Sequence, residues 1–118
     1  MTSMSFKGSC HCGQINFEVE GNLEQVFECN CSHCSRKGYL LWFVPPSKFK
    51  LLSSEMGLAK YTFNNHVINH HFCSTCGCAP FGLGTLRSGA ETALINVRCL
   101  EGVELSSLKR VPVDGRSF

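Results

Sequence analysis

The sequence predicts a small, mainly β domain. Short segments of alternating or continuous apolar residues follow one another closely, and glycine or proline turns separate them. The chain has 118 residues, of which 43% are hydrophobic and 17% are charged, so a modest core is possible and a disordered chain is excluded. We expect one domain over residues 1–118, because no repeat, low-complexity tract or linker divides the sequence.

The first predicted strand covers residues 14–20, where Ile15, Phe17 and Val19 alternate with polar residues between glycine turns. A strand end at residues 26–28 and a short helix at residues 32–38 follow. The continuous apolar run at residues 40–44 predicts a buried strand, which Pro45 and Pro46 end. Further short strands are expected at residues 49–52, 60–63, 68–72 and 93–100.

Nine of the residues are cysteine, so a complete set of intrachain disulfides is excluded. The first residues contain no apolar signal-peptide core, and we therefore expect a cytoplasmic, reducing location where stable disulfides are rare. Eight of the cysteines form three groups, at positions 10 and 12, at 29, 31 and 34, and at 73, 76 and 78. Thiols two or three residues apart can face one ion, so this spacing predicts zinc. Iron–sulfur is the main alternative, although the common C-x-x-C-x-x-C run is absent.

The cysteine groups differ in the number of ligands that they can supply. Structural zinc has four protein ligands, whereas catalytic zinc often has three and one open position. A closed, structural site would use Cys10, Cys12, Cys73 and Cys76, and an open site would use Cys29, Cys31 and Cys34. The spacing alone also allows other pairings.

Three motifs occur in a distinctive order: GSCHCG at residues 8–13, CNCSHC at residues 29–34 and FCSTCG at residues 72–77. Over residues 6–118 the sequence resembles the glutathione-dependent formaldehyde-activating enzyme family, whose superfamily includes centromere protein V. The resemblance implies a zinc-bound fold of short antiparallel sheets, the β-tent fold shared with accessory proteins of Rab GTPases. It also implies one structural zinc and one exchangeable, catalytic zinc, with the same two ligand sets.

The resemblance implies a carbon–sulfur lyase-like enzyme that adds the thiol of glutathione to formaldehyde. Zinc with an open position could hold the thiol as a thiolate or polarise the aldehyde carbonyl, and the sequence does not choose between them. His33 lies between two of the open-site cysteines and is the nearest candidate for proton transfer, with a solvated loop histidine as the alternative. The expected partners are a small thiol and a small aldehyde.

A non-catalytic zinc module for protein interaction is the competing class. The formal charge of +2 is too low to indicate nucleic-acid binding, and no apolar run approaches the ~20 residues of a membrane span. Arg36 and Lys37 follow the open site and could either meet substrate carboxylates or remain ordinary surface charges.

The remaining candidates are cysteine, aromatic and histidine residues outside the predicted metal sites. Cys78 is interpreted as a small buried residue, with approach to a zinc or a redox-sensitive thiol as the alternatives. Cys99 is interpreted as a core residue within the strand at 93–100. Trp42 and Phe43 could line a pocket, but core packing is the preferred reading. His70 and His71 would point to opposite faces of a strand, so at most one can face a site.

Overall fold

The protein contains two sheets that share one core. The computed structural model describes residues 4–53, 57–62, 68–85 and 89–114. A three-stranded sheet has the order β1-β2-β5, and a seven-stranded sheet has the order β10-β3-β4-β9-β8-β7-β6. The strands are β1 (Met4–Ser9), β2 (Asn16–Gly21), β3 (Gln25–Cys29), β4 (Leu41–Val44), β5 (Phe49–Leu51), β6 (Leu58–Tyr61), β7 (Ile68–Cys73), β8 (Phe81–Thr85), β9 (Glu91–Asn96) and β10 (Lys109–Val113).

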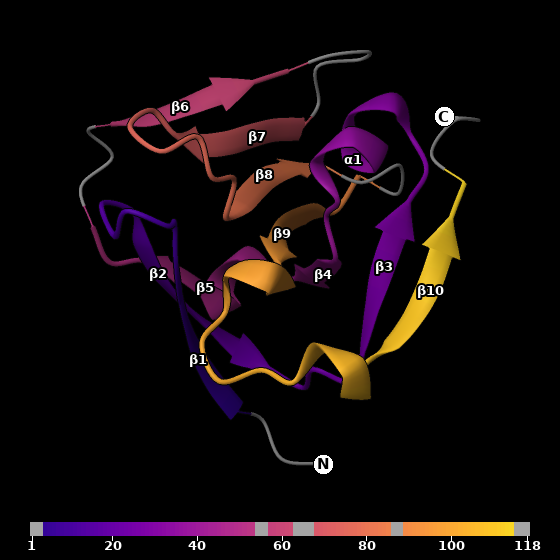
Figure 1. Ribbon diagram of the computed structural model, residues 1–118. Helices are drawn as coiled ribbons and strands as arrows, with labels where there is room; N and C mark the ends of the chain where they lie inside the picture. Colours follow the sequence, from indigo (N-terminus) through magenta and orange to yellow (C-terminus); the bar gives the residue numbers. More distant parts are fainter. Residues whose placement is uncertain (1–3, 54–56, 63–67, 86–88, 115–118) are drawn as a thin grey trace.

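Among the described residues, helical structure occurs only in short segments. They are the helix α1 (Ser32–Lys37) and the 3₁₀ turns η1 (Pro46–Lys48), η2 (Val97–Cys99) and η3 (Leu105–Ser107). No helix in the described part of the chain is long and apolar enough to cross a bilayer. The prediction of a mainly β domain with short antiparallel sheets is therefore confirmed (Figure 1).

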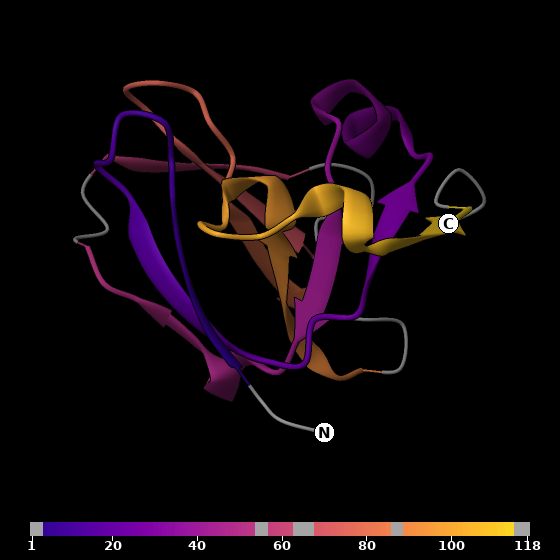
Figure 2. The same cartoon turned by 60° about the horizontal axis from the view of Figure 1, so that its bottom comes forward.

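One strand pair departs from the antiparallel pattern. β10 pairs with β3 in parallel, with Lys109 opposite Gln25 and Val113 opposite Cys29. Figure 2 shows the two indigo strands β1 and β2 on the opposite side of the molecule from the yellow β10. The last strand thus supports β3, which leads directly into the second cysteine group.

The seven-stranded sheet has apolar clusters on both faces. Trp42 and Val44 of β4 join the cluster that contains Phe17 of β2, whereas Leu41 joins a second cluster with Cys34 of α1. Strands with both faces buried have continuous apolar sequences rather than alternating ones. This explains the apolar run at residues 40–44. Trp42 and Phe43 pack in these clusters, and neither is among the residues that line the cavity beside α1.

Local sequence patterns located most strands correctly. Ile15, Phe17 and Val19 are each fully buried, as the alternation predicts. The strand predicted at residues 60–63 lies instead at Leu58–Tyr61, and residue 63 is outside the described part of the chain.

Two aspects of the strand prediction were wrong. β1, β8 and β10 were not predicted, because glycine in β1 and β8 and proline in β10 weaken the strand pattern. The strand predicted at residues 93–100 ends at Asn96, whose side chain accepts a hydrogen bond from the Arg98 N–H and begins η2. Cys99 consequently lies in a 3₁₀ turn and not in a strand.

Gly8 is required by close packing between β1 and β2. A Cβ atom at this position would overlap the ring of Phe17, which lies opposite Gly8 in the strand register. We expect Gly8→Ala to lower the free energy of unfolding by about 1–3 kcal/mol, because a buried aromatic ring must move. Urea unfolding of the zinc-loaded protein measures this change, and Ser5→Ala on an exposed position of β1 is the control. An unchanged midpoint for Gly8→Ala would contradict the packing argument.

Candidate metal centres

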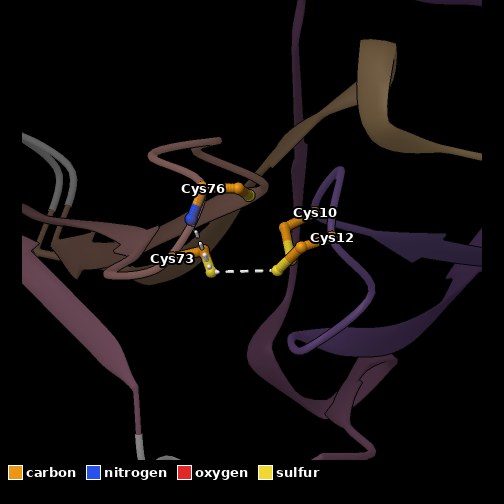
Figure 3. A group of neighbouring side chains, drawn as sticks. All are labelled: Cys10, Cys12, Cys73 and Cys76. Atoms are coloured by element: carbon orange, nitrogen blue, oxygen red, sulfur yellow. Dashed lines mark hydrogen bonds between the residues drawn. The ribbon is translucent and has the colours of Figure 1, made fainter.

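The first cysteine cluster joins two distant turns. Cys10 and Cys12 lie between β1 and β2, whereas Cys73 ends β7 and Cys76 lies in the following turn (Figure 3). The four sulfur atoms lie within 4.8 Å of one another. The Sγ–Sγ distances are 3.6 Å from Cys10 to Cys12 and 3.6 Å from Cys12 to Cys73.

The arrangement of the four sulfur atoms suits one shared metal ion, and all four cysteines are free thiols. Thiolates bound to tetrahedral zinc at about 2.3 Å lie about 3.8 Å apart, whereas disulfide sulfurs are about 2.05 Å apart. The four-cysteine cluster could therefore hold a metal ion, as the sequence predicted.

Backbone N–H groups support charged sulfurs in this cluster. The N–H of Ile15 donates to Cys10 Sγ at 3.3 Å, and the N–H of Cys76 donates to Cys73 Sγ at 3.5 Å. The backbone N–H groups of Cys12 and Cys78 lower the pKa of Cys76 to about 6. Because metal ligands must be thiolates, these hydrogen bonds favour metal binding.

The second cluster is formed by three cysteines close together in the chain. Cys29 ends β3, Cys31 caps the start of α1, and Cys34 lies within α1. Their sulfur atoms lie within 4.8 Å of one another, and no other cysteine, histidine or acidic ligand atom joins the group in the described part of the chain. The cluster could hold a metal ion with three protein ligands.

The start of α1 shapes this cluster. The Cys34 N–H donates to Cys31 Sγ at 3.3 Å, so the capping interaction also orients a potential ligand. At the other end Gly38 adopts a left-handed conformation, with φ of 69°, and its N–H donates to the Cys34 carbonyl. Hydrogen bonds at both ends of α1 thus involve the backbone of Cys34 and fix its position.

The pKa values of the three thiols are shifted in different directions. Burial raises the pKa of both Cys29 and Cys34. Burial also raises the pKa of Cys31, but the Cys34 N–H and neighbouring thiols lower it more, so the net change is downward. A bound cation would compensate the cost of charging all three sulfurs.

A cavity of about 560 Å³ lies beside α1. It is lined by residues of α1, by one residue that follows α1, and by residues of β6 and β7, namely Ser32, His33, Arg36, Lys37, Tyr39, Tyr61, His70 and Phe72. Tyr39 and Phe72 also pack in the apolar cluster that contains Cys34. The helix that contains Cys34 and is capped by Cys31 therefore supplies half of the residues that line the cavity.

Aromatic rings form one side of the cavity. The His33 ring lies 4.3 Å from that of His70 and 5.3 Å from that of Tyr61, and the second pair is stacked. Arg36 and Lys37 stand at the same cavity as exposed cations, with Lys37 Nζ 5.7 Å from the Phe72 ring centre. The cavity thus combines apolar ring faces with positive charge.

His70 is a cavity residue that the sequence interpretation did not select. It is buried, whereas the ring of His71 packs against Phe81, 5.3 Å away, so only one of the two faces the cavity. The available signal was strand alternation, which places His70 on the same face of β7 as Phe72. His66, which the sequence places in a turn at residues 64–66, lies outside the described residues.

Burial, followed by the charge of His33, lowers the pKa of His70 to about 4. This value is below the ordinary histidine pKa of about 6.5, so the folded protein favours neutral His70. The contribution of neutral His70 to the free energy of unfolding is therefore fully present above about pH 6.5. We expect stability on the order of 1 kcal/mol, after allowing for solvent screening, to be lost as the pH falls towards 4.

Urea unfolding of the protein and of His70→Gln, each at about pH 7 and about pH 5, tests this linkage. Loss of zinc in acid affects both proteins, so the quantity of interest is the difference between them. The advantage of the wild-type protein over the variant should shrink at the lower pH. A constant or growing advantage would contradict neutral burial of His70.

The fold and the two clusters define a small, mainly β protein with two cysteine-rich centres, each of which could hold a metal ion. The chain belongs to the glutathione-dependent formaldehyde-activating enzyme family, whose model matches residues 5–110. The crystal structure of a Rhodobacter sphaeroides protein is similar to it, with 32% sequence identity and a TM-score of 0.77. That similarity covers 89% of this chain and 99% of the other.

Proposed function

We propose that the protein is a zinc-dependent, carbon–sulfur lyase-like enzyme that adds a thiol such as glutathione to formaldehyde or another small aldehyde. The observation that carries this proposal is a three-cysteine cluster with no fourth ligand among the described residues, next to a cavity with cationic and aromatic walls. Membership of the family supports the glutathione and formaldehyde chemistry.

Two zinc ions per chain are part of the proposal. The four-cysteine cluster would hold a structural ion, because it joins the first turn of the chain to the end of β7. Cys29, Cys31 and Cys34 would hold an exchangeable ion. When bound there, zinc supplies a positive charge and an open position that can lower the pKa of a thiol or polarise a carbonyl.

The cavity residues would bind and orient the substrate. Arg36 and Lys37 would attract the carboxylates of a glutathione-like thiol, since both cations line the cavity. Tyr61 and His33 offer stacked rings against which the peptide part can lie. Binding along these residues would place the thiol near α1, and therefore near the three cysteines.

His33 is the proposed proton carrier. Burial, followed by the charge of Lys37, lowers its pKa, so the imidazole is neutral near pH 7 and can accept a proton. In the reaction a bond forms between sulfur and the aldehyde carbon, and the thiol proton is transferred to the former carbonyl oxygen. His33 would take that proton from sulfur and return it to oxygen.

The direct test is the rate of S-hydroxymethylglutathione formation and breakdown, measured by NMR exchange with the zinc-loaded protein. We expect the protein to accelerate the exchange above the spontaneous rate. His33→Asn should reduce kcat by roughly 100-fold or more if His33 carries the proton. A zinc-loaded, folded protein that accelerates no thiol–aldehyde addition would favour the protein-interaction module instead.

Removing the two cations of the cavity should affect substrate binding more than the rate of the chemical step. For the double variant Arg36→Gln and Lys37→Gln we expect a KM for glutathione about tenfold higher and a smaller change in kcat, because the lost attraction acts mainly on substrate binding and the loss of Lys37 also acts on His33. Lys48→Gln, which removes an exposed cation paired with Glu20, is the control. An unchanged KM in the double variant would exclude these residues from carboxylate binding.

A further inference from the structure

We propose that Cys78 and Cys99 are a redox-active thiol pair that forms a reversible disulfide beside the four-cysteine cluster, without using any of the possible metal ligands. Their Sγ atoms lie 3.5 Å apart although the residues are 21 positions apart in the chain. Neither residue belongs to the two groups of possible metal ligands. The sequence favoured core packing for both cysteines, with a redox-sensitive thiol as an alternative for Cys78, and did not predict that the two are in contact.

The backbone holds the two cysteines next to each other. Cys78 precedes β8 and Cys99 follows β9, and these strands pair with Phe81 opposite Ile95. Asn96 extends the pairing: its backbone N–H donates to the Pro80 carbonyl at 3.0 Å, and its side-chain Nδ2 donates to the Ala79 carbonyl at 3.0 Å. The two segments are thus joined up to the positions next to the cysteines.

Two further hydrogen bonds fix the cysteines within their own turns. The Cys73 N–H donates to the Cys78 carbonyl at 2.9 Å, which closes the turn after β7. The Arg98 N–H donates to Asn96 Oδ1 at 3.2 Å, which fixes the start of η2. Because both segments are ordered in the thiol form, closing the S–S bond needs little additional ordering of the chain.

The pair is also accessible to a small oxidant. Cys78 and Cys99 are each half-buried, so neither is sealed in the core. With zinc at both clusters the other seven cysteines would be bound as thiolates, which leaves these two as the free thiols. The two thiols that do not bind zinc therefore lie in contact with each other.

The oxidant class is a low-molecular-weight disulfide. One cysteine, as a thiolate, attacks a sulfur of the small disulfide, forms a mixed disulfide and releases one small thiol. The second cysteine loses its proton and attacks the mixed disulfide, which forms the Cys78–Cys99 bond and releases the second small thiol. Two electrons pass from the protein sulfurs to the small disulfide, and a dithiol reductant reverses the reaction.

The experiment exposes the zinc-loaded protein to glutathione disulfide, blocks free thiols and measures the intact mass, the cross-linked peptides and the zinc content. We expect a product lighter by two hydrogen atoms, a Cys78–Cys99 cross-linked peptide and unchanged zinc. The oxidised protein should melt about 5–10 °C above the reduced protein, because the bond closes a loop in the unfolded chain. The variants Cys78→Ser and Cys99→Ser should each fail to give the cross-link.

Three outcomes would overturn the proposal. They are an unmodified protein after equilibration, a stable glutathione adduct on the wild-type protein, and a cross-link that contains a cluster cysteine and releases zinc. Each can be read on the wild-type protein, so the result does not depend on whether a variant folds. None involves turnover, so failure here is distinguishable from failure of the proposed enzyme activity.

Discussion

Cys73→Ser is expected to prevent stable folding. Cys73 is buried and its sulfur lies 3.6 Å from Cys12, so the substitution removes the link between the end of β7 and the turn after β1. Structural zinc sites contribute about 10–16 kcal/mol apparent in small peptides, which is comparable to the whole stability of about 5–15 kcal/mol of a typical domain. Loss of this site should therefore exceed what the remaining core can compensate.

Circular dichroism and thermal unfolding measure this effect, together with elemental analysis for zinc. Cys78→Ser is the matched control, because the same chemical change is made in the same turn at a cysteine outside the cluster. The control should remain folded with its full zinc content. If Cys73→Ser melts at the wild-type temperature, the structural role of the four-cysteine cluster is wrong.

Cys31→Ser is expected to abolish activity while the fold persists. The substitution leaves Cys29 and Cys34, and two thiolates hold zinc much less tightly than three. We expect one zinc per chain instead of two and a loss of thiol–aldehyde addition of at least 100-fold. Serine can still cap α1, so the helix should be retained.

The control for this prediction is Ser35→Ala, which changes an exposed side chain on the same helix that is not a possible metal ligand. It should retain both zinc ions and activity. If Cys31→Ser lost its fold as completely as Cys73→Ser, the two clusters would have the same role and the separate assignment would be wrong. Full activity of Cys31→Ser with one zinc would also contradict a catalytic role for the second cluster.

Local patterns in the sequence predicted much of the fold. The alternation of Ile15, Phe17 and Val19 is typical of a strand with one face in the core. The apolar run at residues 40–44 is typical of a strand with both faces covered. The cysteine groupings were predictable for the same reason. A short turn places two sulfurs near one point, so the spacing within each group carries the geometry.

Non-local contacts were much less predictable. β10 is a strand because Val111 and its neighbours pair in parallel with β3, more than eighty positions earlier in the chain. The cavity depends on α1 meeting β7, and the contact between Cys78 and Cys99 depends on the register of β8 and β9. Hydrophobic periodicity is read over short stretches of sequence, so it cannot predict any of these contacts between distant segments.

The most direct test of the central claim is a crystal structure of the zinc-loaded protein soaked with glutathione, with anomalous diffraction recorded at the zinc edge. We predict two zinc peaks, one with four protein sulfurs and one with Cys29, Cys31, Cys34 and the glutathione sulfur, with the peptide along Arg36 and Lys37. A fourth protein ligand at the second zinc, or a single zinc at the four-cysteine cluster, would contradict the claim.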